Sequence, residues 1–174
     1  MRWFWIDRFV EFVCGEYAES IKHVSMSEPQ VCGNIPSLPA MPTSLVIEGM
    51  AQTGGMLVGQ IFNFESKVVL AKIAKARFEF LPTAGQTIRY RTTIERLTDD
   101  GGIVSGECWV DGQPMGTAEI VFAYLNSGFE DTRLFQPSEI LEVLRSLKLF
   151  DVARYPDGRR LEIPASLLAP DVPV

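Results

Sequence analysis

Glu48 is the residue whose surroundings most favour chemistry. It is the only charged residue between Ser44 and Phe64, a stretch that is otherwise mostly apolar. A carboxylate is costly to bury unless it is paired, protonated or facing a cavity. Taken alone, Glu48 is therefore better interpreted as a solvent-facing side chain in the first turns of a helix; an acid/base group at a cavity is the alternative, and the motif around Glu48 favours it. Gln52, one helical turn later, is placed to hydrogen-bond Glu48, although a buried amide satisfied by backbone is the competing interpretation.

The single histidine, His23, limits the other kinds of chemistry. One histidine cannot build a zinc site of two or three histidines, and any Ser-His-Asp or Cys-His arrangement must use it. His23 falls in an alternating segment, and we interpret it as a surface or edge-strand residue. The sequence lacks a Gly-x-Gly-x-x-Gly fingerprint, a Walker-type Gly-Lys-Ser/Thr and a Cys-x-x-Cys pair, so we expect no metal and no cofactor.

Composition and charge exclude several classes of protein. The 174 residues suffice for one domain with one core, and a net charge of -6 disfavours general binding to nucleic acid. Three cysteines, an odd number, fit reduced thiols in a cytoplasm. The apolar start is interrupted too early for a signal peptide, and no apolar run is long enough to predict a membrane span.

A helix over about residues 43–63 is expected to carry Glu48. Pro42, Thr43 and Ser44 supply its turn, cap and first-turn residues. It is apolar nearly all round, which is typical of a helix buried beneath a sheet. Before it, residues 26–43 hold four prolines, which forbid a helix through that segment and predict a long loop of the kind that often carries function.

The remaining segments predict an antiparallel sheet and a C-terminal extension. Strands are expected over residues 17–25, 68–80, 86–97, 103–110 and 115–125, separated by turns of which Asp111-Gly112 is the clearest hairpin. Residues 2–12 fit either a short helix or a strand. We divide the chain into a domain of residues 1–126 and an extension of residues 127–174, which holds a short helix at about 137–148 and a proline-rich tail and is not a separate domain.

The run from Asn34 to Gln52 resembles the central motif of the (3R)-hydroxyacyl-acyl-carrier-protein dehydratases of fatty-acid synthesis. That family typically has His-Phe-Pro-Gly-His-Pro, an apolar residue, Met-Pro-Gly, and an apolar stretch ending in Glu-Ala-(apolar)-Ala-Gln, against Asn-Ile-Pro-Ser-Leu-Pro-Ala-Met-Pro-Thr-Ser-Leu-Val-Ile-Glu-Gly-Met-Ala-Gln here. The resemblance covers roughly residues 3–125. It implies an α+β hot-dog fold, in which an antiparallel sheet wraps a long central hydrophobic helix, and a homodimer or a higher assembly of dimers.

The resemblance also implies roles for individual residues. In the family, a loop histidine removes the α-proton, a helix carboxylate from the other subunit handles the β-hydroxyl, and amides at the helix N-terminus hold the thioester oxygen. Glu48 matches the carboxylate, whereas Asn34 replaces the histidine; an amide can position a water or a carbonyl but cannot be the base. The positions expected to bind substrate are Ile35, Met41, Pro42, Thr43, Ser44 and Gln52.

Three functions follow from these residues. The first is a dehydratase-like enzyme that acts on or binds a 3-hydroxyacyl thioester of acyl-carrier protein or coenzyme A, with Glu48 and Asn34 as its catalytic pair. The second is an acyl thioesterase in which Glu48 activates water or attacks the carbonyl. The third is a non-catalytic acyl binder, or a subunit that partners a histidine-bearing homologue.

One group of basic residues could receive an acidic carrier protein, as the family's basic rim does, with solvated strand faces as the alternative interpretation. The group comprises Lys67, Lys72, Lys75, Arg77, Arg89 and Arg91.

Overall fold

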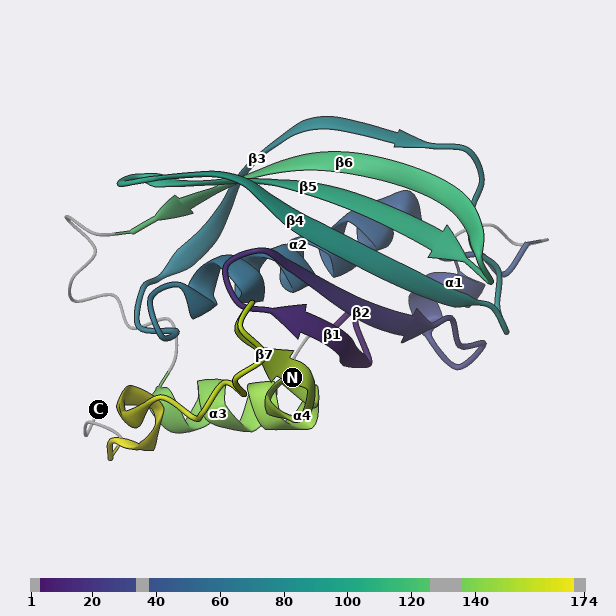
Figure 1. Cartoon of the computed structure of the whole chain (residues 1–174). Helices are drawn as coiled ribbons and strands as arrows, with labels where there is room; N and C mark the ends of the chain where they lie inside the picture. The colour runs from purple at the N-terminus through teal and green to yellow at the C-terminus, as the bar shows by residue number, and fades with distance from the viewer. Residues whose placement is uncertain (1–3, 34–37, 126–135, 171–174) are drawn as a thin grey trace.

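The computed structural model describes residues 4–33, 38–125 and 136–170, which form one curved sheet, one long helix and a C-terminal extension (Figure 1). The strands are β1 (Arg8–Val13), β2 (Tyr17–His23), β3 (Val68–Phe78), β4 (Thr87–Thr98), β5 (Gly101–Val110), β6 (Gln113–Tyr124) and β7 (Ala153–Arg154). The helices are α1 (Pro29–Cys32), α2 (Thr43–Gln60), α3 (Pro137–Ser146), α4 (Leu149–Val152) and the 3-10 helix η1 (Ala165–Leu168).

The sheet has the strand order β3-β6-β5-β4-β2-β1-β7. Neighbouring strands are antiparallel except for β1 and β7, which run parallel. The predicted hairpin at Asp111-Gly112 joins β5 to β6, and both of its residues have positive φ angles, of 49° and 86°, as a tight two-residue turn requires. The N-terminal segment that sequence patterns left open contains the strand β1.

Helix α2 lies in the concave face of the sheet, as Figure 1 shows. Its buried residues, among them Met50, Leu57 and Val58, belong to the same hydrophobic core as residues of the sheet. Gly49 permits the closest approach, because a Cβ built at this position would lie 2.6 Å from the ring of Tyr90 on β4. The near-continuous apolar sequence of α2 is therefore explained by burial, as predicted.

The bounds of α2 differ slightly from those predicted. Pro42 is the N-cap and Thr43 is already helical, so Thr43 is not the cap; Pro42, with φ −60° and ψ 144°, ends the extended segment immediately before the helix. The helix ends at Gln60 rather than near residue 63, because Asn63 and Phe64 adopt left-handed backbone angles that cannot continue it.

The two edges of the sheet differ. At one edge the extension covers β1: the amide of Phe9 donates to Leu147 O at 2.8 Å, and the amide of Cys14 donates to Arg154 O at 2.8 Å. At the other edge β3 is mostly exposed, including Leu70 and Ile73, whose exposures of 43% and 41% are high for large apolar side chains. One edge is thus covered within the chain, whereas the outer side of β3 has no partner strand among the described residues.

Candidate active site

Glu48 lies in the second turn of α2 and is half-buried. Its Oε1 accepts a hydrogen bond of 2.9 Å from Nε2 of Gln52, so the contact expected from their spacing along the helix is present. The carboxylate is therefore held by a neutral amide. No salt bridge of Glu48 is found in the described part of the chain.

Gln52 is itself oriented by the N-terminal segment. The backbone N–H of Trp5, which is buried, donates to Gln52 Oε1 at 2.8 Å. Because the amide oxygen of Gln52 faces Trp5, its NH₂ group is turned toward Glu48. Sequence patterns did not indicate Trp5, since any residue except proline could supply this backbone donor.

The N-terminus of α2 lies one turn before Glu48. Met41 is fully buried, Thr43 is half-buried and Ser44 is exposed. The first N–H groups of a helix have no acceptor within the helix, so those of Thr43 and Ser44 are candidates to bind a carbonyl oxygen or an oxyanion. Pro42 has no N–H to contribute. Asn34 and Ile35, the remaining predicted site residues, lie outside the described residues.

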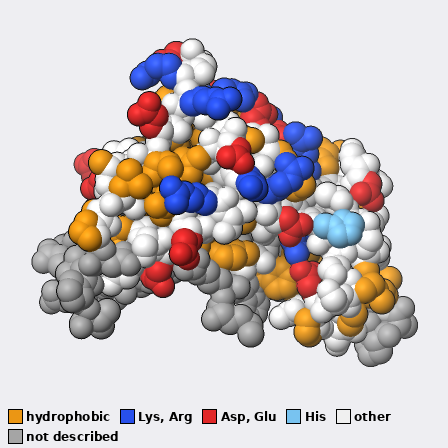
Figure 2. Space-filling view, turned by 90° about the horizontal axis from the view of Figure 1, so that it is seen from below, with side chains coloured by type: hydrophobic (Ala, Val, Ile, Leu, Met, Phe, Trp, Pro, Cys, Tyr) orange, Lys and Arg blue, Asp and Glu red, His pale blue; other side chains and the backbone are white. Residues whose placement is uncertain are grey.

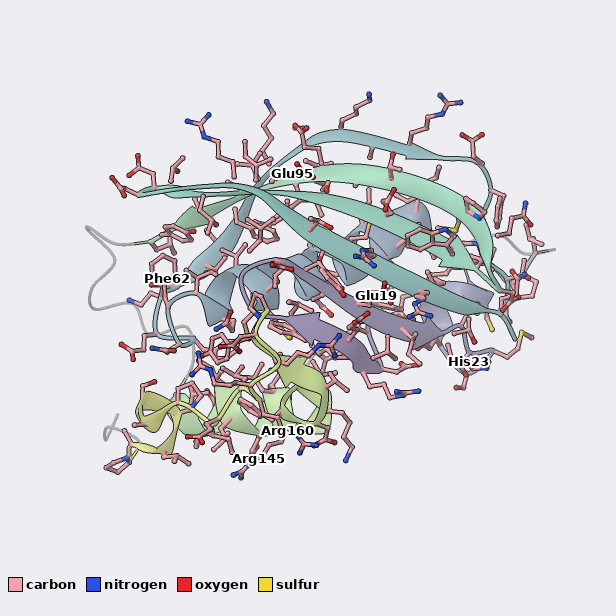
Figure 3. The ribbon with its side chains drawn as sticks, in the orientation of Figure 1. Glu19, His23, Phe62, Glu95, Arg145 and Arg160 are labelled. Atoms are coloured by element: carbon pink, nitrogen blue, oxygen red, sulfur yellow. The ribbon has the colours of Figure 1, made fainter. Side chains whose placement is uncertain are left out.

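His23 lies at the end of β2 and is exposed at the surface (Figures 2 and 3). Its ring nitrogen Nδ1 lies 3.2 Å from Thr87 Oγ1, and its backbone N–H donates to Asp7 Oδ2 at 2.7 Å. Neither contact involves Glu48. The interpretation of His23 as a surface residue therefore agrees with its exposure.

Two other titratable groups near α2 are unsuited to proton transfer near neutral pH. Burial raises the pKa of the Cys108 thiol to about 12 and holds the pKa of Tyr90 well above its ordinary value. The described residues also contain no group of three or more His, Cys, Asp or Glu side chains that could hold a metal ion. Cys108 and Tyr90 are therefore poor alternatives to Glu48 as the predicted acid/base group.

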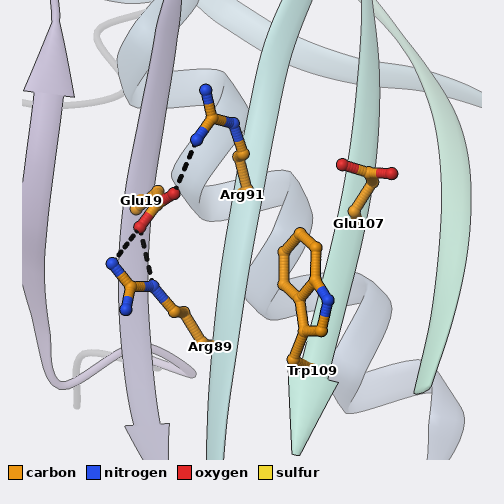
Figure 4. A pocket seen from close by; sticks show the side chains of 5 residues that line it. All are labelled: Glu19, Arg89, Arg91, Glu107 and Trp109. Carbon is orange, nitrogen blue, oxygen red and sulfur yellow. Dashed lines mark hydrogen bonds and ion pairs between the residues drawn. The ribbon is translucent and has the colours of Figure 1, made fainter. Parts of the chain in front are cut away.

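A shallow hollow of about 370 Å³ lies on the other face of the sheet (Figure 4). Its lining residues are Glu19, Arg89, Arg91, Glu107 and Trp109. Glu19 accepts hydrogen bonds of 2.7 Å from Arg89 Nε and 2.8 Å from Arg91 Nη1. Arg89 and Arg91, which belong to the six basic residues proposed to meet a carrier protein, are therefore paired with Glu19, and Arg77 of the same group pairs with Glu79. The sheet separates this hollow from Glu48.

No helix in the described part of the chain has both the length and the apolar character needed to cross a bilayer.

A long apolar helix held in the concave face of an antiparallel sheet, with a carboxylate in its second turn, defines a protein of the hot-dog fold. Residues 4–119 match the FabA-like domain, and the chain belongs to that family. The extension that contains α3, α4, β7 and η1 lies beyond the matched residues.

Individual comparisons agree with this assignment. The chain is 37% identical over 122 residues to the 3-hydroxyacyl-[acyl-carrier-protein] dehydratase FabZ of Shewanella frigidimarina, which covers 68% of this chain and 80% of the relative. The fold of the present chain is similar to that of a chain in the dehydratase heterocomplex ApeI:P from Xenorhabdus doucetiae. The TM-score is 0.60 and the identity 16%, and the match covers 80% of the present chain and 88% of the other. A hot-dog-like protein from Thermanaerovibrio acidaminovorans gives a TM-score of 0.57, 16% identity and coverage of 76% and 93%. The predicted family and fold are confirmed.

Proposed function

We propose that this protein is a dehydratase-like lyase that acts on 3-hydroxyacyl thioesters of acyl-carrier protein or coenzyme A in the cytoplasm. The observation that carries the proposal is the carboxylate of Glu48, half-buried on the central helix of a dehydratase-family fold and hydrogen-bonded by the neutral amide of Gln52. A carboxylate within reach of the substrate can take up a proton and return it during the reaction, which is what acid/base catalysis requires.

In the proposed reaction, water is eliminated from the acyl chain. The thioester oxygen binds at the N–H groups of Thr43 and Ser44, which stabilise the negative charge that develops on it. The carboxylate of Glu48 takes the α-proton and returns a proton to the β-hydroxyl, which leaves as water while the carbon–carbon double bond forms. Asn34 orients the substrate, because its amide cannot accept the proton.

The test offers one 3-hydroxyacyl thioester to wild type, Glu48→Gln and Asn34→His. We expect measurable 2-enoyl product from wild type, background levels from Glu48→Gln and a gain in Asn34→His, because histidine supplies a base near neutral pH. A wild type without turnover, together with no gain in Asn34→His, would refute the proposal.

A thioesterase is the second candidate, favoured by the combination of Glu48 with the helix N-terminal amides in a chain whose single histidine lies at the surface. Glu48 then activates a water that attacks the thioester carbonyl, and the thiol leaves. Release of free thiol from a saturated acyl thioester distinguishes this reaction from dehydration. Loss of that release in Glu48→Gln supports the thioesterase, and unchanged release excludes it.

We infer that the protein assembles through β3 as a dimer. The exposed strand edge and the apolar side chains of Leu70 and Ile73 support this, since such an edge is usually paired or covered. Light scattering after gel filtration tests the dimer, and a monomer would contradict it.

Because the Xenorhabdus neighbour is a chain of a heterocomplex, the third candidate is a subunit that partners a histidine-bearing homologue. Co-purification with a second hot-dog chain supports that candidate, and full activity of the homomer excludes it.

A further inference from the structure

Lys22 is an unusual residue for its position. It lies on β2, on the same strand face as Ser20, whose hydroxyl contacts Thr53 of α2 at 2.6 Å. Only 8% of its side chain is exposed, and lysine is seldom buried to this extent unless it is paired. The ammonium group of Lys22 therefore needs partners within the fold.

Those partners come from two separate segments. Nζ of Lys22 donates to Oδ1 of Asp7, just before β1, at 3.2 Å, and to Oε1 of Glu28, the N-cap residue of α1. Burial alone would lower the pKa of Lys22, but the hydrogen bond to Glu28 and the charge of Asp7 outweigh it, so the pKa is raised and the ammonium stays charged. Lys22 thus ties the segment before β1 to α1.

The segment before β1 leads directly to the candidate catalytic group. The ring of Trp5 lies under the ammonium of Lys22, with 5.8 Å between Nζ and the ring centroid. The backbone N–H of Trp5 holds Gln52, and Gln52 donates to Glu48. A continuous set of contacts therefore joins Lys22 through Trp5 and Gln52 to Glu48.

We propose that Lys22 is a positioning residue for Glu48. By holding Asp7 and the ring of Trp5, it fixes the backbone N–H that orients the Gln52 amide, and that amide fixes the carboxylate of Glu48. Without Lys22, the carboxylates of Asp7 and Glu28 would repel each other and the segment at Trp5 would loosen. The catalytic consequence rests on the proposed function, whereas the structural consequence does not.

The test compares Lys22→Met, which removes the ammonium, with Lys22→Arg, which keeps a cation. Lys148→Met is the matched control, because Lys148 is exposed on the extension. Amide hydrogen exchange is measured by NMR. We expect exchange at Trp5 to rise by about tenfold or more in Lys22→Met while the amides of Leu57 and Val58 in α2 keep their protection, since only a local segment is released. Lys22→Arg should restore part of the protection at Trp5.

Kinetics give the second readout. On a 3-hydroxyacyl thioester, kcat of Lys22→Met should fall by about tenfold or more with KM nearly unchanged, since a displaced acid/base group slows the chemical step more than binding. Unchanged exchange at Trp5, or an equal rise throughout α2, would overturn the proposal. If Lys22→Met does not fold, Glu28→Gln, which weakens one of the two ion pairs, decides by the same exchange measurement. A wild type without turnover, together with no gain in Asn34→His, refutes the proposed function, and the exchange result still decides the role of Lys22.

Discussion

The two faces of the sheet each carry a carboxylate, and the two carboxylates are held in different ways. Glu19, on the outer face, is 8% exposed and binds the guanidinium groups of both Arg89 and Arg91. Glu48, on the helix within the concave face, is half-buried and receives its hydrogen bond from the neutral amide of Gln52. The first is held by two fixed positive charges, whereas the second has a neutral hydrogen-bond donor.

This difference shows why a hollow does not by itself indicate an active site. The outer hollow contains four charged side chains and Trp109, yet its buried carboxylate joins β2 to β4 by ion pairs across neighbouring strands. Arg91 is further fixed by stacking on Tyr17, with 3.9 Å from its guanidinium carbon to the ring centroid. We therefore expect the outer region to govern stability and the inner region to govern activity.

The largest expected effect is on activity. Glu48→Gln should lower turnover by about 10²-fold or more on whichever thioester, 3-hydroxyacyl or saturated acyl, the wild type converts, because the proton-transfer group is lost. The free energy of unfolding should change by less than about 1 kcal/mol. Steady-state kinetics and urea unfolding measure the two quantities. Glu107→Gln, in the outer hollow, is the control and should leave turnover unchanged. A large loss in the control with none in Glu48→Gln would reverse the comparison between the two faces.

The next effect is on stability. Glu19→Gln should lower the free energy of unfolding by about 2 kcal/mol, because two arginines lose their charged partner. Breaking a fully buried ion pair would cost about 3–5 kcal/mol. The cost here is smaller because Arg89 and Arg91 are 55% and 35% exposed and stay partly solvated. Urea unfolding measures the change. Turnover per folded molecule should stay near the wild-type value, and a loss as large as that of Glu48→Gln would contradict a structural role.

A smaller change tests the packing behind Glu48. Gly49→Ala should destabilise the fold by about 1–2 kcal/mol, because its Cβ would lie 2.6 Å from the Tyr90 ring and push α2 away from β4. Gly55→Ala is the matched control: its Cβ would lie 3.3 Å from an atom of the Phe122 ring, so less movement is needed and alanine favours the helix. Thermal unfolding compares the two variants, and a Gly49→Ala protein at least as stable as Gly55→Ala would refute the close approach.

The sequence allowed local features to be predicted better than contacts between distant residues. The contact of Gln52 with Glu48 follows from one helical turn, and the β5–β6 hairpin follows from Asp111-Gly112. By contrast, Trp5 reaches Gln52 across 47 positions through a backbone N–H, which no side-chain pattern marks. The pairing of Arg89 with Glu19 spans 70 positions and depends on strand register, so residues counted as one basic group have different roles in the fold.

The smallest expected effect is a pH dependence of the outer network, which extends to Glu11. Burial alone would raise the pKa of Glu11, but hydrogen bonds from Tyr17 and Arg154 outweigh it and lower the pKa. A carboxylate with a lowered pKa in the folded state stabilises the fold above its unfolded-state pKa of about 4.3 and loses that contribution as the pH falls through the folded-state value. Between pH 7 and about pH 3, wild type should therefore lose about 0.5–1 kcal/mol more unfolding free energy than Glu11→Gln. Urea unfolding across this range tests it, with Glu162→Gln, which removes an exposed carboxylate, as the control. Identical pH dependence of wild type and Glu11→Gln would show that this end of the outer network contributes nothing to stability.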